Sequence, residues 1–106
     1  MTKEELLTTY KNGQRNFSNA NLRWANLRWA NLQGAIGNNK EVKSLQLDTW
    51  NIVYTNEILA IGCKQYTIEK WKNFTNHEIN IMHIEALIWW KKWKPIIFNI
   101  IEMTNK

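Results

Sequence analysis

Some residue types and patterns are scarce in this sequence, and their scarcity excludes several classes of protein. Cys63 is the one cysteine, so the chain cannot form an internal disulfide. The first residues lack the charged, apolar and small-residue succession of a secretory signal, and we therefore expect a cytoplasmic protein. The apolar run that follows Pro95 is too short to span a bilayer, so we expect no membrane association.

Motifs of catalysis are missing as well. The sequence holds no Gly-rich phosphate loop, no His-Glu-x-x-His motif and no paired cysteines. His77 and His83 are six positions apart, which on a helix would place them about 240° apart around the axis, so they could not share a metal ion. We expect no catalytic residue, no metal and no cofactor, and we predict that the protein is not an enzyme.

Positive charge exceeds negative charge. Fourteen Lys and Arg residues stand against nine Asp and Glu residues, for a net charge of +5, and residues 64–94 contain six Lys against three Glu. A basic surface favours anionic partners, among them nucleotides, nucleic acids and acidic proteins. A lysine-rich face that is merely solvated explains the same charge. No helix-turn-helix, zinc finger or RNA-binding module is recognisable, so nucleic acid is the least favoured of these partners.

The most regular stretch is NANLRWANLRWANLQGAIG, at residues 19–37. It repeats Ala-Asn-Leu at intervals of five, a period that fits neither an α-helix nor a β-strand. In this frame, small residues occupy the first position of the unit and large apolar residues the third. The residues that we expect to form the core of the repeat are Phe17, Ala20, Leu22, Ala25, Leu27, Ala30 and Leu32.

This repeat resembles the pentapeptide-repeat family over about residues 15–39. The resemblance implies a right-handed quadrilateral β-helix, in which about twenty residues make one square coil, so the clean units make only about one coil. A single coil cannot bury its own leucines. We expect an N-terminal helix, the following segment or another copy of the chain to cover it, and we expect a homo-oligomer.

Capping motifs and alternating apolar residues predict the helix and the strands that flank the repeat. Thr2 and Glu5 have the spacing of a capping box, which predicts a short helix over residues 3–12. After the repeat, alternating apolar residues predict strands at about 43–48, 51–55 and 57–63. A degenerate second coil over residues 40–55 is the alternative, because several apolar residues there keep the five-residue phase.

Helices are expected in the last third of the chain. Capping patterns predict a helix over residues 67–73 and a longer helix that begins near residue 75 and that Pro95 ends or kinks. A final helical segment follows the proline. The fold class is therefore α+β, with an N-terminal helix and coil at residues 1–39 and a strand-and-helix part at residues 40–106, packed together as one compact unit.

The order of segments after the repeat carries a second resemblance. The stretch AIGCKQYTIEKWKNF is followed by HIEALIWWKKWKPII. This order is similar to a small C-terminal domain of proteins encoded by bacteriophages and prophages, usually uncharacterised, and it covers residues 40–103. The resemblance implies expression in the cytoplasm of a bacterial host cell, where phage accessory proteins counter bacterial defence.

Arg-Trp pairs close two of the repeat units, Arg23 with Trp24 and Arg28 with Trp29. The family commonly has a small residue at this corner, so the resemblance implies that both indole rings lie outside the coil. Exposed rings of this size are usually covered by something, and Arg beside Trp can stack on a base and bind a phosphate. We predict ligand or partner binding here, and packing on the C-terminal helices or at an oligomer interface is the alternative.

A second candidate site lies in the segment WWKKWK, at residues 89–94. On a helix Trp89 and Trp93 share one face, and the lysines spread over the other side. Core tryptophans beneath a cover of lysines are the simpler interpretation. A partly open aromatic pocket with a lysine rim would instead bind an aromatic anion, and Trp89, Lys92 and Trp93 are then its binding residues.

These observations support two hypotheses of function. The first is a non-enzymatic, phage-type accessory protein that sequesters a nucleotide-like anionic ligand, as a counter-defence, through its Trp, Arg and Lys surfaces. The alternative is a protein-interaction module that inhibits or adapts a host bacterial protein and binds no small molecule. Relatives that mimic DNA are long acidic rods, so the resemblance disfavours that role for a short basic chain.

Overall fold

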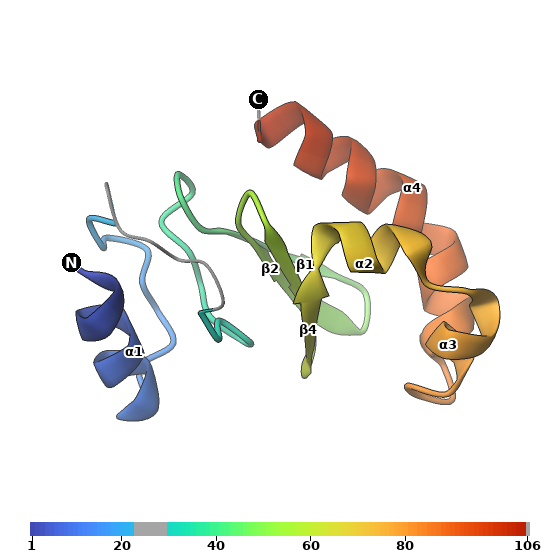
Figure 1. The fold of residues 1–106 in the computed structure, drawn as a ribbon, viewed down its shortest axis with the longest axis horizontal. Helices are drawn as coiled ribbons and strands as arrows, with labels where there is room; N and C mark the ends of the chain where they lie inside the picture. The colour runs from blue at the N-terminus through green and yellow to red at the C-terminus, as the bar shows by residue number, and fades with distance from the viewer. Residues whose placement is uncertain (23–29, 106) are drawn as a thin grey trace.

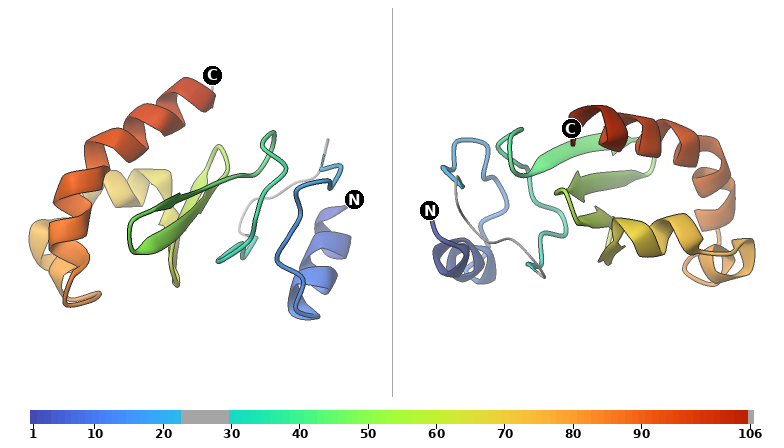
Figure 2. Two further views of the ribbon diagram at one scale, coloured as in Figure 1. Left: turned by 180° about the vertical axis from the view of Figure 1, so that it is seen from behind. Right: turned by 45° about the horizontal axis from the view of Figure 1, so that its top comes forward.

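The computed structural model describes residues 1–22 and 30–105, which form a mixed fold of helices and strands (Figure 1). Its helices are α1 (Lys3–Lys11), α2 (Ile68–Asn73), α3 (Asn76–Asn80) and α4 (Ala86–Thr104), and its strands are β1 (Lys43–Leu47), β2 (Trp50–Tyr54), β3 (Ile58–Ile61) and β4 (Lys64–Thr67). The elements lie in layers: α1 at one end, then the repeat segment, then the sheet, then the C-terminal helices (Figure 2). The α+β expectation is confirmed.

The N-terminal helix begins as the sequence predicts. The Thr2 hydroxyl accepts a hydrogen bond from the Glu5 N–H at 3.1 Å, and the Glu5 carboxylate accepts one from the Thr2 N–H at 3.3 Å. This capping box satisfies two N–H groups that the first helical turn leaves without partners. Gly13 follows the helix with a φ of 103°, a conformation that glycine adopts without strain.

The segment after α1 returns on itself after twenty residues. Asn16 and Ile36 form a parallel bridge, in which the Phe17 N–H donates to the Ile36 carbonyl at 2.8 Å and the Ile36 N–H donates to the Arg15 carbonyl at 2.7 Å. Burial follows the five-residue frame. The buried third-position residues are Phe17, Leu22, Leu32, Gly37 and Val42; at the first position Ala30 and Ala35 are buried and Ala20 is partly buried.

The strands form an antiparallel sheet in the order β1-β2-β3-β4. Its two faces bury different side chains, because successive residues of a strand point to opposite sides. Val53, Ile58 and Ala60 pack against the repeat segment and Leu6 of α1. The other face, with Ile52, Tyr54, Leu59 and Ile61, packs against the C-terminal helices.

The strands predicted at about 43–48, 51–55 and 57–63 are confirmed as β1, β2 and β3, but the third ends at Ile61, because the chain turns at Gly62 and adds β4, which the sequence did not predict. Gly62 has a φ of 58°, and a Cβ at this position would lie 2.9 Å from Cδ1 of Trp50. Glycine therefore permits both the left-handed turn and the close approach of the indole ring. As a result Cys63, which the sequence placed within an apolar strand, is exposed in the turn.

The helix predicted from residue 75 to Pro95 is wrong. α3 has the expected capping box between Thr75 and Glu78, but it ends at Asn80, and α4 begins only at Ala86. Between them the His83 Nδ1 accepts a hydrogen bond from the Glu85 N–H at 3.1 Å, and this local bond organises the turn that precedes α4.

Pro95 does not end α4, which continues to Thr104. A proline cannot donate the backbone hydrogen bond of a helix interior, and its ring crowds the preceding turn. The ribbon of α4 changes direction along its length, as expected beside a proline (Figure 2). Ile97 and Ile101 lie beyond the proline and are buried against the sheet, and this packing holds the second half of the helix in place.

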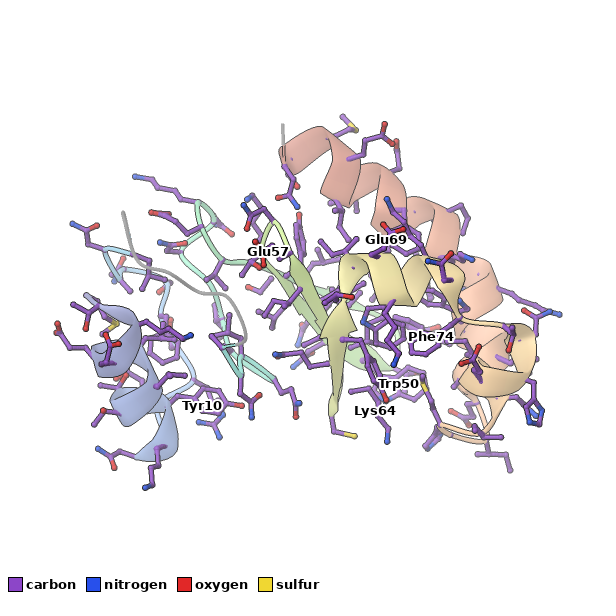
Figure 3. All side chains as sticks on the ribbon, in the orientation of Figure 1. Tyr10, Trp50, Glu57, Lys64, Glu69 and Phe74 are labelled. Atoms are coloured by element: carbon purple, nitrogen blue, oxygen red, sulfur yellow. The ribbon has the colours of Figure 1, made fainter. Side chains whose placement is uncertain are left out.

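Contacts within the chain cover both sides of the repeat segment. On the α1 side the hydroxyl of Tyr10, which is labelled in Figure 3, donates to the Gln33 carbonyl at 2.5 Å. The Arg15 guanidinium lies 3.7 Å from the centre of the Tyr10 ring. On the other side the Gln65 carboxamide of β4 bonds the backbone of Ala30 and Leu32. The helix and the following segment thus supply the cover that the sequence analysis required.

Candidate binding surface at the α3–α4 turn

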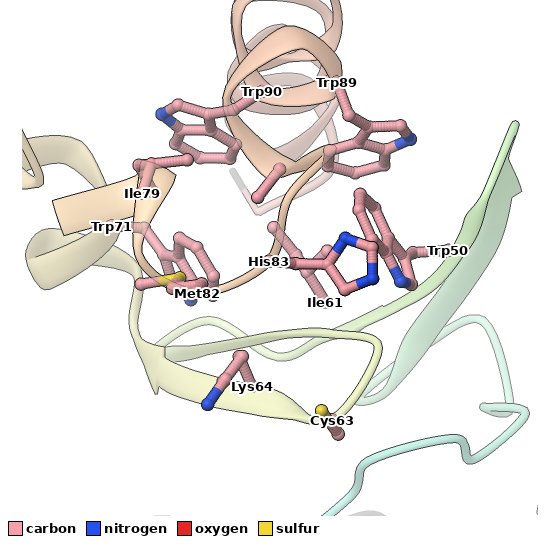
Figure 4. Close-up of a pocket in the computed structure, with 11 residues that line it drawn as sticks. Trp50, Ile61, Cys63, Lys64, Trp71, Ile79, Met82, His83, Trp89 and Trp90 are labelled. Carbon is pink, nitrogen blue, oxygen red and sulfur yellow. The ribbon is translucent and has the colours of Figure 1, made fainter. Parts of the chain in front are cut away.

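An apolar pocket opens between one end of the sheet and the helices that pack on it (Figure 4). Its volume is about 70 Å³. The wall is mainly aromatic and aliphatic. The residues that line the pocket are Trp50, Ile61, Cys63, Lys64, Trp71, Ile79, Met82, His83, Ala86, Trp89 and Trp90.

Ring contacts fix the walls of the apolar pocket. Trp50 of β2 makes edge-to-face contacts with Trp89, at 5.2 Å between ring centroids, and with His83, at 5.3 Å. On the opposite wall Trp71 and Trp90 lie 5.3 Å apart with their planes tilted by 41°. Aromatic pairs at these separations add stability beyond the burial of their area.

The indole N–H groups of two wall tryptophans are already engaged. Trp71 Nε1 donates to the Leu59 carbonyl at 2.7 Å, and Trp89 Nε1 donates to the Leu47 carbonyl at 2.9 Å. Both bonds tie a helix to a strand, so they hold the rings in place. Since these donors are occupied, the two rings offer a ligand mainly apolar contact.

Three polar side chains lie around the mouth of the apolar pocket. Cys63 and Lys64 come from the turn between β3 and β4, and His83 comes from the turn before α4 (Figure 4). All three residues are exposed. Of the described residues that line the pocket, Lys64 is the only Lys, Arg, Asp or Glu.

Exposed isoleucines flank the same turn. Ile81 is 70% exposed, Ile84 89% and Ile88 78%. We call these three residues the isoleucine patch. They alternate along the chain with residues of the pocket wall, because Met82, His83 and Ala86 belong to the pocket. The patch and part of the pocket wall therefore come from the same stretch of chain, and we refer to them together as the apolar surface at the α3–α4 turn.

The structure separates the residues predicted for the α4 site. Trp89 is buried and lines the apolar pocket, whereas Lys92 and Trp93 are not among the residues of its wall. Lys92 lies 3.8 Å from the Asp48 carboxylate and 5.0 Å from the Trp93 ring, with 62% of its side chain exposed. The expected lysine rim above the tryptophans is thus absent from the wall, and Lys64 occupies the mouth in its place.

Trp93 differs from its neighbours on α4. It is partly buried among the residues between the sheet and the helices. Its Nε1 atom is buried and has no hydrogen-bond partner in the described part of the chain. The predicted shared face of Trp89 and Trp93 is thus directed at the sheet, and core packing explains both rings.

The other predicted site lies outside the described residues. This applies to Arg23, Trp24, Arg28 and Trp29, and also to Ala25 and Leu27 of the predicted core. Ligand or partner binding at the Arg-Trp pairs therefore stays a prediction.

Sequence reasoning missed the isoleucine patch and Lys64 as parts of a surface. The sequence predicts one long helix from about residue 75 to Pro95, and this prediction hides the turn that exposes Ile81 and Ile84. A signal was present in His83, whose ring can bond a nearby backbone N–H and so interrupt a helix.

Outside the pocket, Glu78 at the start of α3 has a shifted pKa. The Thr75 backbone N–H, which donates to the Glu78 carboxylate at 2.9 Å, and the Thr75 side chain lower the pKa of Glu78, and this shift belongs to the cap of α3. Within residues 1–22 and 30–105, no group of three or more His, Cys, Asp and Glu side chains could hold a metal ion. The same residues contain no helix long and apolar enough to cross a membrane.

Comparison with known proteins adds one finding. A family model described as pentapeptide repeats (8 copies) matches residues 16–36. No curated protein matches the chain, and no solved structure matches it. The resemblance of residues 15–39 to the repeat family is thus supported, whereas the phage setting and the resemblance of residues 40–103 stay predictions.

Proposed function

We propose that the protein is a non-enzymatic binding module that docks on another protein through the apolar surface at the α3–α4 turn. The exposure of the isoleucine patch is the observation that carries this proposal. Ile84 and Ile88 keep more than three quarters of their surface in water, and each adjoins in the chain a residue that lines the apolar pocket, His83 or Trp89. Several large apolar side chains left exposed on one short stretch of chain are typical of interaction sites.

The fold does not need these isoleucines for its own core. α4 buries Trp89, Trp90, Ile97 and Ile101 against the sheet and the neighbouring helices. Ile88 directly precedes the buried Trp89 and Trp90 in the chain, but it lies on another side of α4 and is exposed. Because each exposed isoleucine would contribute about 1.5–3 kcal/mol if it were fully buried, a partner that covers the patch gains binding energy there.

We also propose that residues 15–42 form about one turn of the right-handed β-helical coil that the family resemblance implies. The bridge between Asn16 and Ile36 supports it, since they are twenty positions apart. Burial at every described third position from Phe17 to Val42 is further support. In this proposal the coil supports one face of the sheet, and the docking surface lies on the other side of the sheet, at the α3–α4 turn.

The hypothesis of a nucleotide-like ligand has a different basis. At α4 the geometry favours a protein side chain, because the pocket volume of 70 Å³ is about half of the ~150 Å³ cavity that holds benzene in another protein. Nucleotide sequestration therefore depends on Arg23, Trp24, Arg28 and Trp29. Calorimetry against a panel of cyclic dinucleotides tests it, and heat that disappears in a Trp24→Ala, Trp29→Ala double variant would support it.

Site-specific photo-crosslinking tests the docking proposal. In one sample a photoreactive amino acid replaces Ile84. In the control sample it replaces Ile36, which lies in the repeat segment and is 50% exposed. Both proteins are irradiated in lysate of a bacterial host, in keeping with the predicted setting. The proposal expects a discrete crosslinked protein from position 84 that is missing from position 36.

A competition step makes the result specific. Excess unlabelled wild-type protein should suppress the crosslink, whereas an Ile84→Glu, Ile88→Glu double variant should not. Equal crosslinking from both positions, or equal suppression by both competitors, contradicts docking at the α3–α4 turn. Circular dichroism of the double variant controls for folding, which exposed positions rarely affect.

A further inference from the structure

The size and lining of the apolar pocket restrict what can enter it. A volume of 70 Å³ is too small to enclose an aromatic ring, since benzene occupies a cavity of about 150 Å³ elsewhere. The wall is apolar, and the indole N–H groups of Trp71 and Trp89 are engaged by backbone carbonyls. The pocket therefore suits the end of one aliphatic or thioether side chain, such as that of Leu, Ile or Met.

Charge around the pocket restricts the neighbours of that side chain. Lys64 stands at the mouth, and residues 64–94 carry six Lys against three Glu, a net charge of +3. Elsewhere on the same segment, the ammonium groups of Lys70, Lys72 and Lys94 lie 5.4–6.0 Å from aromatic ring centres. At the pocket itself Lys64 is complementary to an acidic side chain.

A second copy of the chain is a poor occupant for the same reason. Each copy would bring the +3 segment to the contact, and the whole chain carries +5. Like charges that face each other across an interface oppose association. The charge thus favours a partner of opposite sign over self-association at this surface.

We propose that the apolar pocket receives one aliphatic or thioether side chain from an acidic segment of a partner protein, whose carboxylate pairs with Lys64. The isoleucine patch packs on the remaining apolar side chains of the same segment. This inference rests on the proposed function and adds the chemistry of the partner to it. An apolar anchor with a polar, charged rim is the usual anatomy of a protein interface.

Selection of random peptides displayed on phage particles tests the inference with a defined probe. Peptides that bind the full-length wild-type protein are sequenced, synthesised and measured by calorimetry at low and high salt. The inference expects enriched peptides in which Leu, Ile or Met adjoins Asp or Glu. Their affinity should fall as salt is raised, because salt screens an exposed ion pair.

Two variants probe the two parts of the contact. Ala86→Trp fills the pocket and should weaken the selected peptides by about tenfold or more, since the anchor loses its site. Lys64→Glu should weaken them by about threefold or more at low salt. Lys40→Glu makes the same charge change in the loop before β1 and should leave affinity unchanged. Lys64 is exposed, so this variant is informative even where Ala86→Trp fails to fold.

The outcomes separate the inference from the proposed function. Two outcomes overturn the inference and leave the proposed docking surface intact. In the first, the selected peptides lose binding to the Ile84→Glu, Ile88→Glu variant but carry no acidic residues. In the second, they bind Ala86→Trp and Lys64→Glu as tightly as the wild type. A homodimer that the Ile84→Glu, Ile88→Glu variant dissociates overturns it as well, because the occupant is then a second copy. If no peptide depends on Ile84 and Ile88, and position 84 gives no crosslink, both proposals fail.

Discussion

Gln65 and Leu32 are 33 positions apart in the chain, and the Gln65 carboxamide oxygen accepts a hydrogen bond from the Leu32 N–H at 3.0 Å. The amide nitrogen of the same side chain donates to the Ala30 carbonyl at 2.6 Å. One side chain of the edge strand β4 thus satisfies two backbone groups of the repeat segment. Such groups would otherwise need the next coil of a longer repeat, so Gln65 joins the repeat to the sheet.

Replacement of Gln65 tests this connection. Gln65→Ala leaves the Leu32 N–H and the Ala30 carbonyl without their partner in a partly buried place, and we expect the free energy of unfolding to fall by about 1–3 kcal/mol. Gln46→Ala is the matched control, because Gln46 is exposed and bonds only the Asn51 side chain among the described contacts. Urea unfolding measures both, and equal midpoints for the two variants would contradict the role of Gln65.

Two glycines of the repeat segment should differ in their tolerance of alanine. A Cβ on Gly37 would lie 2.1 Å from the Val42 carbonyl oxygen, so the backbone must move in Gly37→Ala. We expect a loss of more than about 3 kcal/mol, at the high end for a single substitution. Gly34 has a φ of 75° and open space around its Cα, so Gly34→Ala should cost only the strain of that conformation, about 1–2 kcal/mol. Thermal melts by circular dichroism rank the variants, and the reverse order would refute the assignment.

The course of α4 beyond Pro95 is testable with neighbouring isoleucines. Ile97 is buried at 2% exposure, and Ile97→Ala should reduce the free energy of unfolding by about 2–5 kcal/mol. Ile96 is 44% exposed, and Ile96→Ala should cost about 1 kcal/mol or less. Denaturant titration compares the two. Equal losses would mean that the helix after the proline does not present the face seen in the structure.

Acid should weaken the cap of α3. Because the Thr75 hydrogen bonds lower the pKa of Glu78 in the folded chain, the folded state binds this proton less readily than the unfolded state does. The resulting stabilisation is present above the unfolded pKa of about 4.3 and is lost as pH falls through the lower folded value. Thr75→Ala keeps the backbone N–H and removes the hydroxyl, so it should raise the Glu78 pKa part of the way toward its ordinary value, as measured by NMR titration of the carboxyl carbon. An unchanged pKa in the variant would assign the shift to another cause.

Local signals in the sequence predicted the elements that depend on local contacts. The capping boxes of Thr2 and Thr75 and the N-cap of Thr67 all form, because each needs only residues three positions apart. The five-residue period of the repeat likewise predicted the burial of Phe17, Leu22, Ala30 and Leu32. Burial of Val42 extends that frame beyond its last clean unit, where the sequence pattern was ambiguous.

The features that the sequence did not reveal depend on contacts between distant residues. The split between β3 and β4 follows from Gly62 beneath the Trp50 ring, twelve positions earlier in the chain. The passage of α4 through Pro95 depends on the packing of Ile97 against the sheet, which outweighs the local cost of a proline. The apolar pocket is likewise made from separate elements, so its wall cannot be seen as a motif.

The sheet contributes to the packing on both of its sides. Val53 and Ala60 belong to the cluster around the repeat, whereas Ile52 and Leu59, their neighbours in the chain, belong to the cluster around the helices. Because successive strand residues belong alternately to the two clusters, separation of the strands would disrupt both clusters. A fragment expressed from either half would expose half of a sheet, and heating of the intact chain should give a single calorimetric transition.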